Sequence, residues 1–190
     1  MESVKRESVE SNKIISFKLI LSNSLKFSHN SNIFTETLHN SPMAAFHFSE
    51  KIIINKSAET VFDYSQDYNK RLEWDTFLKK AELVNGATEV DKGVKAWCVS
   101  KNGIGMETRY VTYSRPWTTA IKMTKGPYMF KTFAGSWTFR NTEDGKSKVT
   151  FFYNYRLRFP FTIIGPFIKN NLRSNVRERL RGLKKCVEAA

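Results

Sequence analysis

The chain ends, from Gly165 to Glu188, in GPFIKNNLRSNVRERLRGLKKCVE, which has the pattern of one long amphipathic helix. Its apolar residues recur every three or four positions and therefore lie on one helical face. They are Ile168, Leu172, Val176, Leu180, Leu183 and Val187. A helix of this size spans roughly 36 Å, so burying its apolar face requires a broad, curved sheet.

The opposite face of the predicted helix is cationic. Its residues are Arg173, Arg177, Arg181, Lys184 and Lys185. The whole chain carries a formal net charge of +13, which is compatible with nucleic acid, an anionic membrane surface or acidic small molecules as partners. A solvated basic surface accounts for the charge equally well, so charge alone selects none of these.

The part of the chain before this helix predicts a sheet. A β-rich run, Phe46 to Ile54, is followed by a short helix from Ala58 to Tyr64, for which Ser57 is the expected N-cap. A second short helical segment is expected at about Tyr68 to Leu72. Six further strands, separated by short turns rich in Gly, Asn, Asp and Pro, predict an antiparallel meander. They are expected at 77–84, 94–100, 105–114, 118–124, 128–140 and 148–159.

The last of these strands shows the clearest alternation. One of its faces is expected to be apolar and mostly aromatic, and the other polar apart from Phe152. The apolar face consists of Val149, Phe151, Tyr153, Tyr155, Leu157 and Phe159. An antiparallel sheet with its helices on one face gives an α+β fold over residues 45–190.

Residues 1–44 differ from the rest in being rich in Ser and Asn. Their acidic residues, among them Glu2, Glu7 and Glu10, are unusual for a targeting peptide. We expect a disordered or leader-like extension and exclude it from the folded domain.

The order of elements and several residues together resemble the START-related (SRPBCC) helix-grip superfamily, which includes polyketide cyclase/dehydrase, lipid-transfer and birch-pollen-allergen-like domains. The resemblance rests on Ser57 to Phe62, Asp67, Trp74-Asp75, the strand at Val84, Gly93, and Leu180 to Lys185 with Glu188. It implies a seven-stranded antiparallel sheet wrapped around the C-terminal helix, with two short helices after the first strand. It also implies a cavity between sheet and helix for a hydrophobic small molecule or lipid.

Aromatic strand residues and the apolar face of the helix are the candidates for lining such a cavity, although aromatic side chains can equally fill a core. The candidate ligand-binding residues are Trp97, Tyr110, Phe133, Trp137, Tyr153, Tyr155, Leu172, Val176, Arg179 and Leu180.

Arg179 falls within the apolar stripe of the helix, where an uncompensated charge is costly. It either reaches the rim, pairs with a buried carboxylate, or meets an acidic ligand headgroup. Glu107 and Arg109 share a strand face and form either an inward acid/base pair or a surface ion pair; we favour the surface, which places Thr108 and Tyr110 inside.

Metal, triad and cofactor chemistry are not indicated. The three histidines include two in the excluded extension, and the two cysteines, Cys98 and Cys186, form no CxxC pattern. Free thiols favour a reducing, cytoplasmic compartment. The chain has no apolar run long enough to span a membrane.

The leading hypothesis is a non-enzymatic carrier for a hydrophobic molecule or lipid, with possible peripheral contact between the basic helix face and anionic membrane. The alternative is a polyketide cyclase/dehydratase-like enzyme, which requires an inward ionisable pair. A weaker alternative is ribosome or nucleic-acid association, which predicts a steep salt dependence. The sequence makes no prediction of oligomeric state.

Overall fold

The computed structural model describes residues 45–190, so the expectation for residues 1–44 lies outside the described part of the chain. A strand, two short helices, six strands and a long helix follow one another. They are β1 (Ala45–Ile54), α2 (Ala58–Gln66), α3 (Arg71–Trp74), β2 (Leu78–Leu83), β3 (Lys95–Ser100), β4 (Gly105–Ser114), β5 (Thr118–Lys125), β6 (Phe130–Asn141), β7 (Ser147–Leu157) and α4 (Gly165–Ala189).

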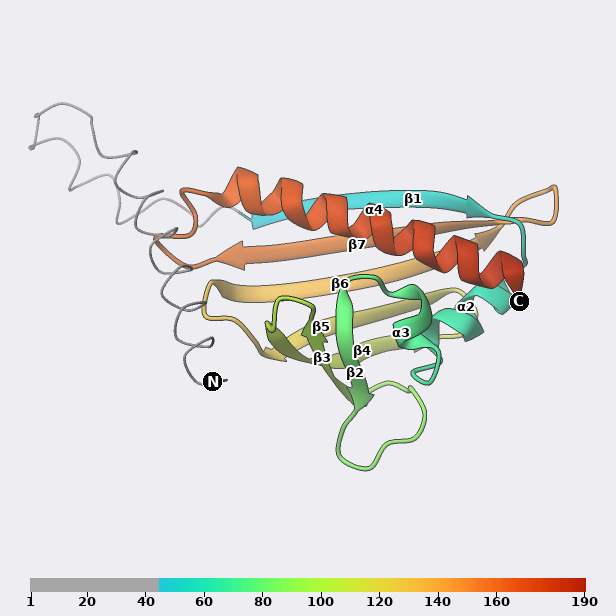
Figure 1. The fold of residues 1–190 in the computed structure, drawn as a ribbon, viewed down its shortest axis with the longest axis horizontal. Helices are drawn as coiled ribbons and strands as arrows, with labels where there is room; N and C mark the ends of the chain where they lie inside the picture. The colour runs from blue at the N-terminus through green and yellow to red at the C-terminus, as the bar shows by residue number, and fades with distance from the viewer. Residues whose placement is uncertain (1–44) are drawn as a thin grey trace, which may run out of the picture. The chain divides into compact units, whose positions relative to one another are not determined.

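The strands form one antiparallel seven-stranded sheet in the order β1-β7-β6-β5-β4-β3-β2. The first strand pairs with the last over its whole length, from Ala45 opposite Arg156 to Ile54 opposite Ser147. Figure 1 shows α4 running lengthwise beside β1 and β7, with α2 and α3 near the C-terminal end of α4. The predicted α+β helix-grip architecture is therefore confirmed.

The first short helix begins where its cap was expected. The side chain of Ser57 accepts a hydrogen bond from the Thr60 amide (3.2 Å), which satisfies one of the free N–H groups at the helix start. The second helix begins later than predicted, at Arg71. The residues from Tyr68 to Lys70 form a turn instead, in which the Arg71 amide donates to the Tyr68 carbonyl (3.3 Å).

The apolar stripe of α4 faces the domain interior as predicted: five of its six residues are buried and Leu172 is half-buried. The cationic face is only partly free. Arg173 and Arg177 both bind the carboxylate of Glu50 on β1, the latter through Nε at 2.9 Å. Lys184 donates to the Ile53 carbonyl (2.9 Å). Part of the basic face therefore holds the helix against the first strand.

The alternation of β7 is confirmed from Ser147 to Leu157, where buried and exposed positions follow each other strictly except for the half-buried Thr150. The prediction that Phe159 continues the buried face is wrong, because this side chain is 69% exposed. The strand ends at Leu157, and a turn follows in which the Phe161 amide donates to the Arg158 carbonyl. Pro160 has no N–H to extend the ladder.

At Gly182, α4 passes close to the backbone of α3. A Cβ atom at this position would overlap the backbone oxygen of Trp74, and backbone cannot move aside as a flexible side chain can. We expect Gly182→Ala to lower the free energy of unfolding by about 1–3 kcal/mol in chemical denaturation, the usual cost of overpacking.

The matched control is Ser174→Ala at an exposed position of the same helix, which should change stability by no more than about 0.5 kcal/mol. Helix propensity alone would make Gly182→Ala stabilising by roughly 1 kcal/mol, so a stabilised variant would contradict the close contact between α3 and α4.

Candidate ligand cavity

A cavity of about 290 Å³ lies between the inner face of the sheet and the N-terminal half of α4. Most of its wall is apolar, with side chains from six strands, β2 to β7, and from α3, α4 and the connecting loops. The lining residues are Tyr68, Arg71, Phe77, Leu78, Cys98, Ser100, Asn102, Ile104, Met106, Thr108, Tyr110, Thr119, Ile121, Pro127, Met129, Phe130, Phe133, Trp137, Phe151, Tyr153, Phe167, Ile168, Asn171, Leu172 and Arg179.

The cavity has an exposed end and a buried end. Its exposed lining residues, Asn102, Ile104, Phe167 and Asn171, come from the β3–β4 loop and the first turns of α4. These two segments therefore form the mouth. The opposite end is closed by buried side chains from α3, β4, β7 and α4, and these include polar and charged groups.

Six of the ten residues predicted from the sequence line this cavity. They are Tyr110, Phe133, Trp137, Tyr153, Leu172 and Arg179. The other four do not. Tyr155, Val176 and Leu180 are buried in the solid part of the core. Trp97 lies opposite Glu107 on the outer face of the sheet, since its neighbours Ala96 and Cys98 are the inward ones.

Tyr155 shows why an aromatic residue on the inner face need not touch the cavity. Its ring stacks on Phe46 (5.5 Å between centroids) and meets Phe130 edge to face (5.6 Å). These neighbours cover it, and burial raises the pKa of its phenol to about 12. Among the described residues its hydroxyl has no hydrogen-bond partner.

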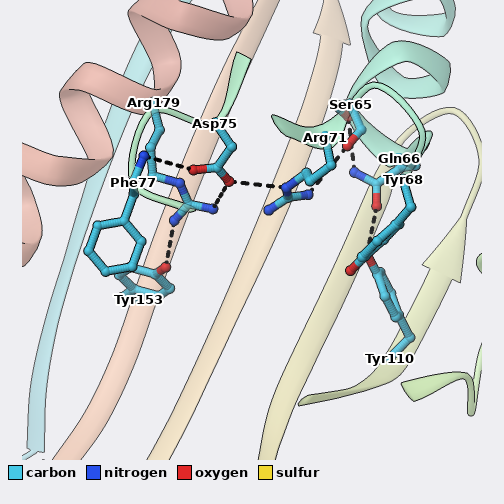
Figure 2. A network of polar contacts seen from close by, with 9 residues as sticks. All are labelled: Ser65, Gln66, Tyr68, Arg71, Asp75, Phe77, Tyr110, Tyr153 and Arg179. Carbon is cyan, nitrogen blue, oxygen red and sulfur yellow. Dashed lines mark hydrogen bonds and ion pairs between the residues drawn. The ribbon is translucent and has the colours of Figure 1, made fainter. Parts of the chain in front are cut away.

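The buried end of the cavity contains a charged cluster centred on Asp75 (Figure 2). One carboxylate oxygen, Oδ2, accepts hydrogen bonds from Arg71 Nε (3.0 Å) and Arg179 Nη2 (2.8 Å). Arg179 Nη1 donates to the hydroxyl of Tyr153 (2.8 Å). The backbone positions these groups, because Arg71 and Asp75 are four residues apart across α3 while Arg179 comes from α4.

Neutral polar groups extend this cluster along the buried end, as Figure 2 shows. Arg71 Nη1 donates to the Ser65 carbonyl (3.4 Å), and the Tyr110 hydroxyl donates to Gln66 Oε1 (3.2 Å). The hydroxyls of Tyr68 and Tyr110 are 3.3 Å apart. Burial raises the pKa of both phenols, so they remain protonated at neutral pH and act as hydrogen-bond donors.

The acid and the two arginines of the cluster favour each other's ionised forms. Burial alone would raise the pKa of Asp75, but Arg179 and Arg71 outweigh it and lower the pKa below its ordinary value. Burial alone would lower the pKa of Arg179, but Asp75 and Tyr153 raise it. Of the alternatives for Arg179, pairing with a buried carboxylate is therefore the one observed.

Arg71 and Asp75 were not identified as site residues from the sequence. The available signal was Arg179 itself, because an arginine in an apolar stripe requires a buried acid as its partner. Glu107, by contrast, lies on the outer face, where it accepts from Lys95 (3.0 Å) and Thr124 (2.7 Å). The surface interpretation of Glu107 agrees with this placement.

Over residues 45–190, no group of three or more His, Cys, Asp or Glu side chains is arranged to hold a metal ion. Within the same residues, no helix is long and apolar enough to cross a membrane.

Solved structures share this architecture at low sequence identity. The aromatase/cyclase Zhui from Streptomyces sp. R1128 gives a TM-score of 0.66 at 11% identity, covering 76% of this chain and 94% of its own. A START superfamily protein from Mycobacterium smegmatis gives 0.62 at 13% identity, covering 75% and 97%. Ara h 8.0201 gives 0.61 at 9% identity, covering 77% and 100%. The fold is that of the helix-grip proteins.

The family model for "Polyketide cyclase / dehydrase and lipid transport" matches residues 45–188. The chain belongs to this family. No curated protein sequence matches it significantly. Family and fold together support a role in hydrophobic ligand binding or in polyketide-cyclase-like chemistry.

Asp75 should make folding sensitive to acid. Because its pKa is lower in the folded chain than the ordinary value of about 3.9, its ionised form stabilises the fold above that pH, and this stability is lost as the pH falls through the folded pKa. We expect Asp75→Asn to cost about 3–5 kcal/mol at neutral pH and to flatten the acid limb of stability against pH. Chemical denaturation at a series of pH values measures both effects.

Glu82→Gln is the matched control, since Glu82 pairs with Lys80 at the surface (2.8 Å). It should cost less than about 1 kcal/mol. An unchanged acid limb in Asp75→Asn would show that Asp75 is not ionised in the folded protein.

Proposed function

We propose that this chain is a binding or carrier protein for a hydrophobic small molecule, which it holds in the cavity between the sheet and α4. The observation that carries the proposal is the cavity itself, which has mostly apolar walls and a charged cluster at its buried end. Ligand pockets usually have this composition, in which apolar side chains contribute contact area and a few polar groups fix orientation.

The dimensions of the cavity favour a small guest. Its volume of about 290 Å³ is near the lower limit of the range of about 300–1,000 Å³ that is usual for small-molecule sites. Aromatic side chains such as Phe133, Trp137 and Phe151 form the apolar wall. These rings suit a single alkyl chain or a small ring system.

A polyketide cyclase-like activity is the second candidate, because the cavity wall is not purely hydrocarbon. Arg71, Tyr68 and Tyr110 could polarise or protonate a carbonyl oxygen. A general base is harder to assign, since both phenols stay protonated and Asp75 is held between two arginines. Binding without catalysis is therefore the better-supported function.

The mouth of the cavity suits entry from an anionic membrane surface. Exposed apolar side chains surround it on the β5–β6 loop and around the start of α4, including Tyr128, Ile163 and Phe167, each 72% exposed. The guanidinium of Arg158 lies 4.9 Å from the centre of the Tyr128 ring. Apolar side chains beside cations are the combination that binds a negatively charged lipid interface.

The direct test is mass spectrometry of organic extracts from protein purified under native conditions, together with titration of the neutral apolar fluorophore N-phenylnaphthylamine. We expect a copurified apolar compound or saturable fluorophore binding. A clean extract together with no binding would overturn the proposed function.

A substitution that fills the cavity tests the location of binding. Thr108 points inward from β4 and lines the cavity, so we expect Thr108→Phe to reduce fluorophore affinity at least about tenfold while the fold is kept. Fluorescence titration measures the change. Thr112→Phe, at an exposed position of the same strand, is the matched control and should bind as the unsubstituted protein does.

Vesicle sedimentation tests entry from the membrane. We expect the protein to pellet with vesicles containing phosphatidylglycerol, and the double variant Ile163→Ser, Phe167→Ser to lose most of this binding. Phe152→Ser is the control, since Phe152 is an exposed aromatic residue of β7 on the outer face. Equal pelleting of both variants would show that the membrane contact does not involve Ile163 and Phe167. Binding to nucleic acid with a steep salt dependence would favour the alternative of nucleic-acid association.

A further inference from the structure

The buried end of the cavity has more positive than negative charge. Two guanidinium groups, Arg71 and Arg179, share the single carboxylate of Asp75. The side chains of all three residues are at least nine-tenths buried, with exposures of 9%, 7% and 0% respectively. Since arginine keeps its proton in proteins, the three residues together carry one net positive charge.

The positive members of the cluster are the ones that contribute to the cavity wall. Both arginines line the cavity, whereas Asp75 does not. Figure 2 shows the Asp75 carboxylate between the two guanidinium groups. Arg179 Nε is buried and has no hydrogen-bond partner among the described residues. The hydrogen bonds of Arg71 to described residues use Nε and Nη1, not Nη2. Each of these two cavity-lining arginines therefore has a donor nitrogen with no partner among the described residues.

An unpaired cation inside a protein is costly unless an anion and hydrogen-bond acceptors compensate it. Within the cluster, the acceptors already in use are Asp75 Oδ2, the Tyr153 hydroxyl and the Ser65 carbonyl. The phenols of Tyr68 and Tyr110 add hydroxyl groups at the same end of the cavity. A bound anion would complete this arrangement.

We propose that the cavity selects amphipathic monocarboxylates, whose carboxylate binds at Arg71 and Arg179 and whose apolar part extends toward the mouth. This proposal rests on the proposed function and adds the chemical class of the ligand. One carboxylate matches one net positive charge, and two acceptor oxygens suit arginine donors. The apolar part lies along Phe133, Trp137 and Ile121.

The first experiment needs no variant. Isothermal titration compares laurate with methyl laurate, which has the same chain but no charge. We expect laurate to bind about tenfold to a hundredfold more tightly, as is usual for a charge-assisted hydrogen-bonded contact. Equal affinity of the two probes would overturn the selection for anions and leave cavity binding intact. Failure of both to bind would overturn the proposed function as well.

Two substitutions change the charge in opposite directions. Arg71→Met leaves a neutral Asp75–Arg179 pair and should remove the difference in affinity between laurate and methyl laurate. Asp75→Asn raises the net charge by one and should tighten laurate binding. Circular dichroism establishes folding of each variant; if either fails to fold, the comparison of probes on the unsubstituted protein decides.

Arg181→Met is the matched control, because Arg181 is an exposed arginine of the same helix and does not line the cavity. Its laurate affinity should equal that of the unsubstituted protein. A similar loss in Arg181→Met and Arg71→Met would show that laurate responds to overall charge, which would overturn the site. Stoichiometric displacement of laurate by chloride would show that the site binds anions without selecting carboxylates. This result would overturn the proposed selection for monocarboxylates.

Discussion

The burial of one face of α4 against the sheet is the contact on which the rest of this structure depends. Charged contacts hold the middle of the helix on two sides. Arg173 and Arg177 bind Glu50 on the edge strand β1. Further along, Arg179 binds Asp75 beside α3. Both β1, at the edge of the sheet, and the short helix α3 are thus bound to α4, which fixes the space between the sheet and α4.

Side chains fill the space between the sheet and α4 unevenly. The apolar residues of α4 show which part is packed and which part is open. Val176, Leu180, Leu183 and Val187 pack into the solid core, whereas Ile168 and Leu172 face the cavity. The short helices α2 and α3 lie near the C-terminal end of α4, and Phe62 and Trp74 from these helices are fully buried there. Only the N-terminal half of α4 therefore leaves room for a guest.

The charged cluster lies at the boundary between these two halves. A buried ion pair contributes little net stability, because desolvation offsets the attraction, so its presence in an otherwise apolar wall is poorly explained by stability alone. Here two arginines converge on one acid, and the surplus charge faces the cavity. Such a cluster makes the two ends of the cavity different, because only the buried end carries charged side chains.

Local pattern alone was sufficient for the elements: the period of α4, the Ser57 cap and the alternation of β7 are properties of neighbouring residues. It failed at Phe159, where a turn interrupts the alternation, and at Trp97 and Tyr155, because periodicity gives the face of a strand but not what covers it. The partnership of Arg71, Asp75 and Arg179 joins residues more than one hundred positions apart. Only the packing of α4 across α3 brings them together, and no periodicity within either segment encodes that distance.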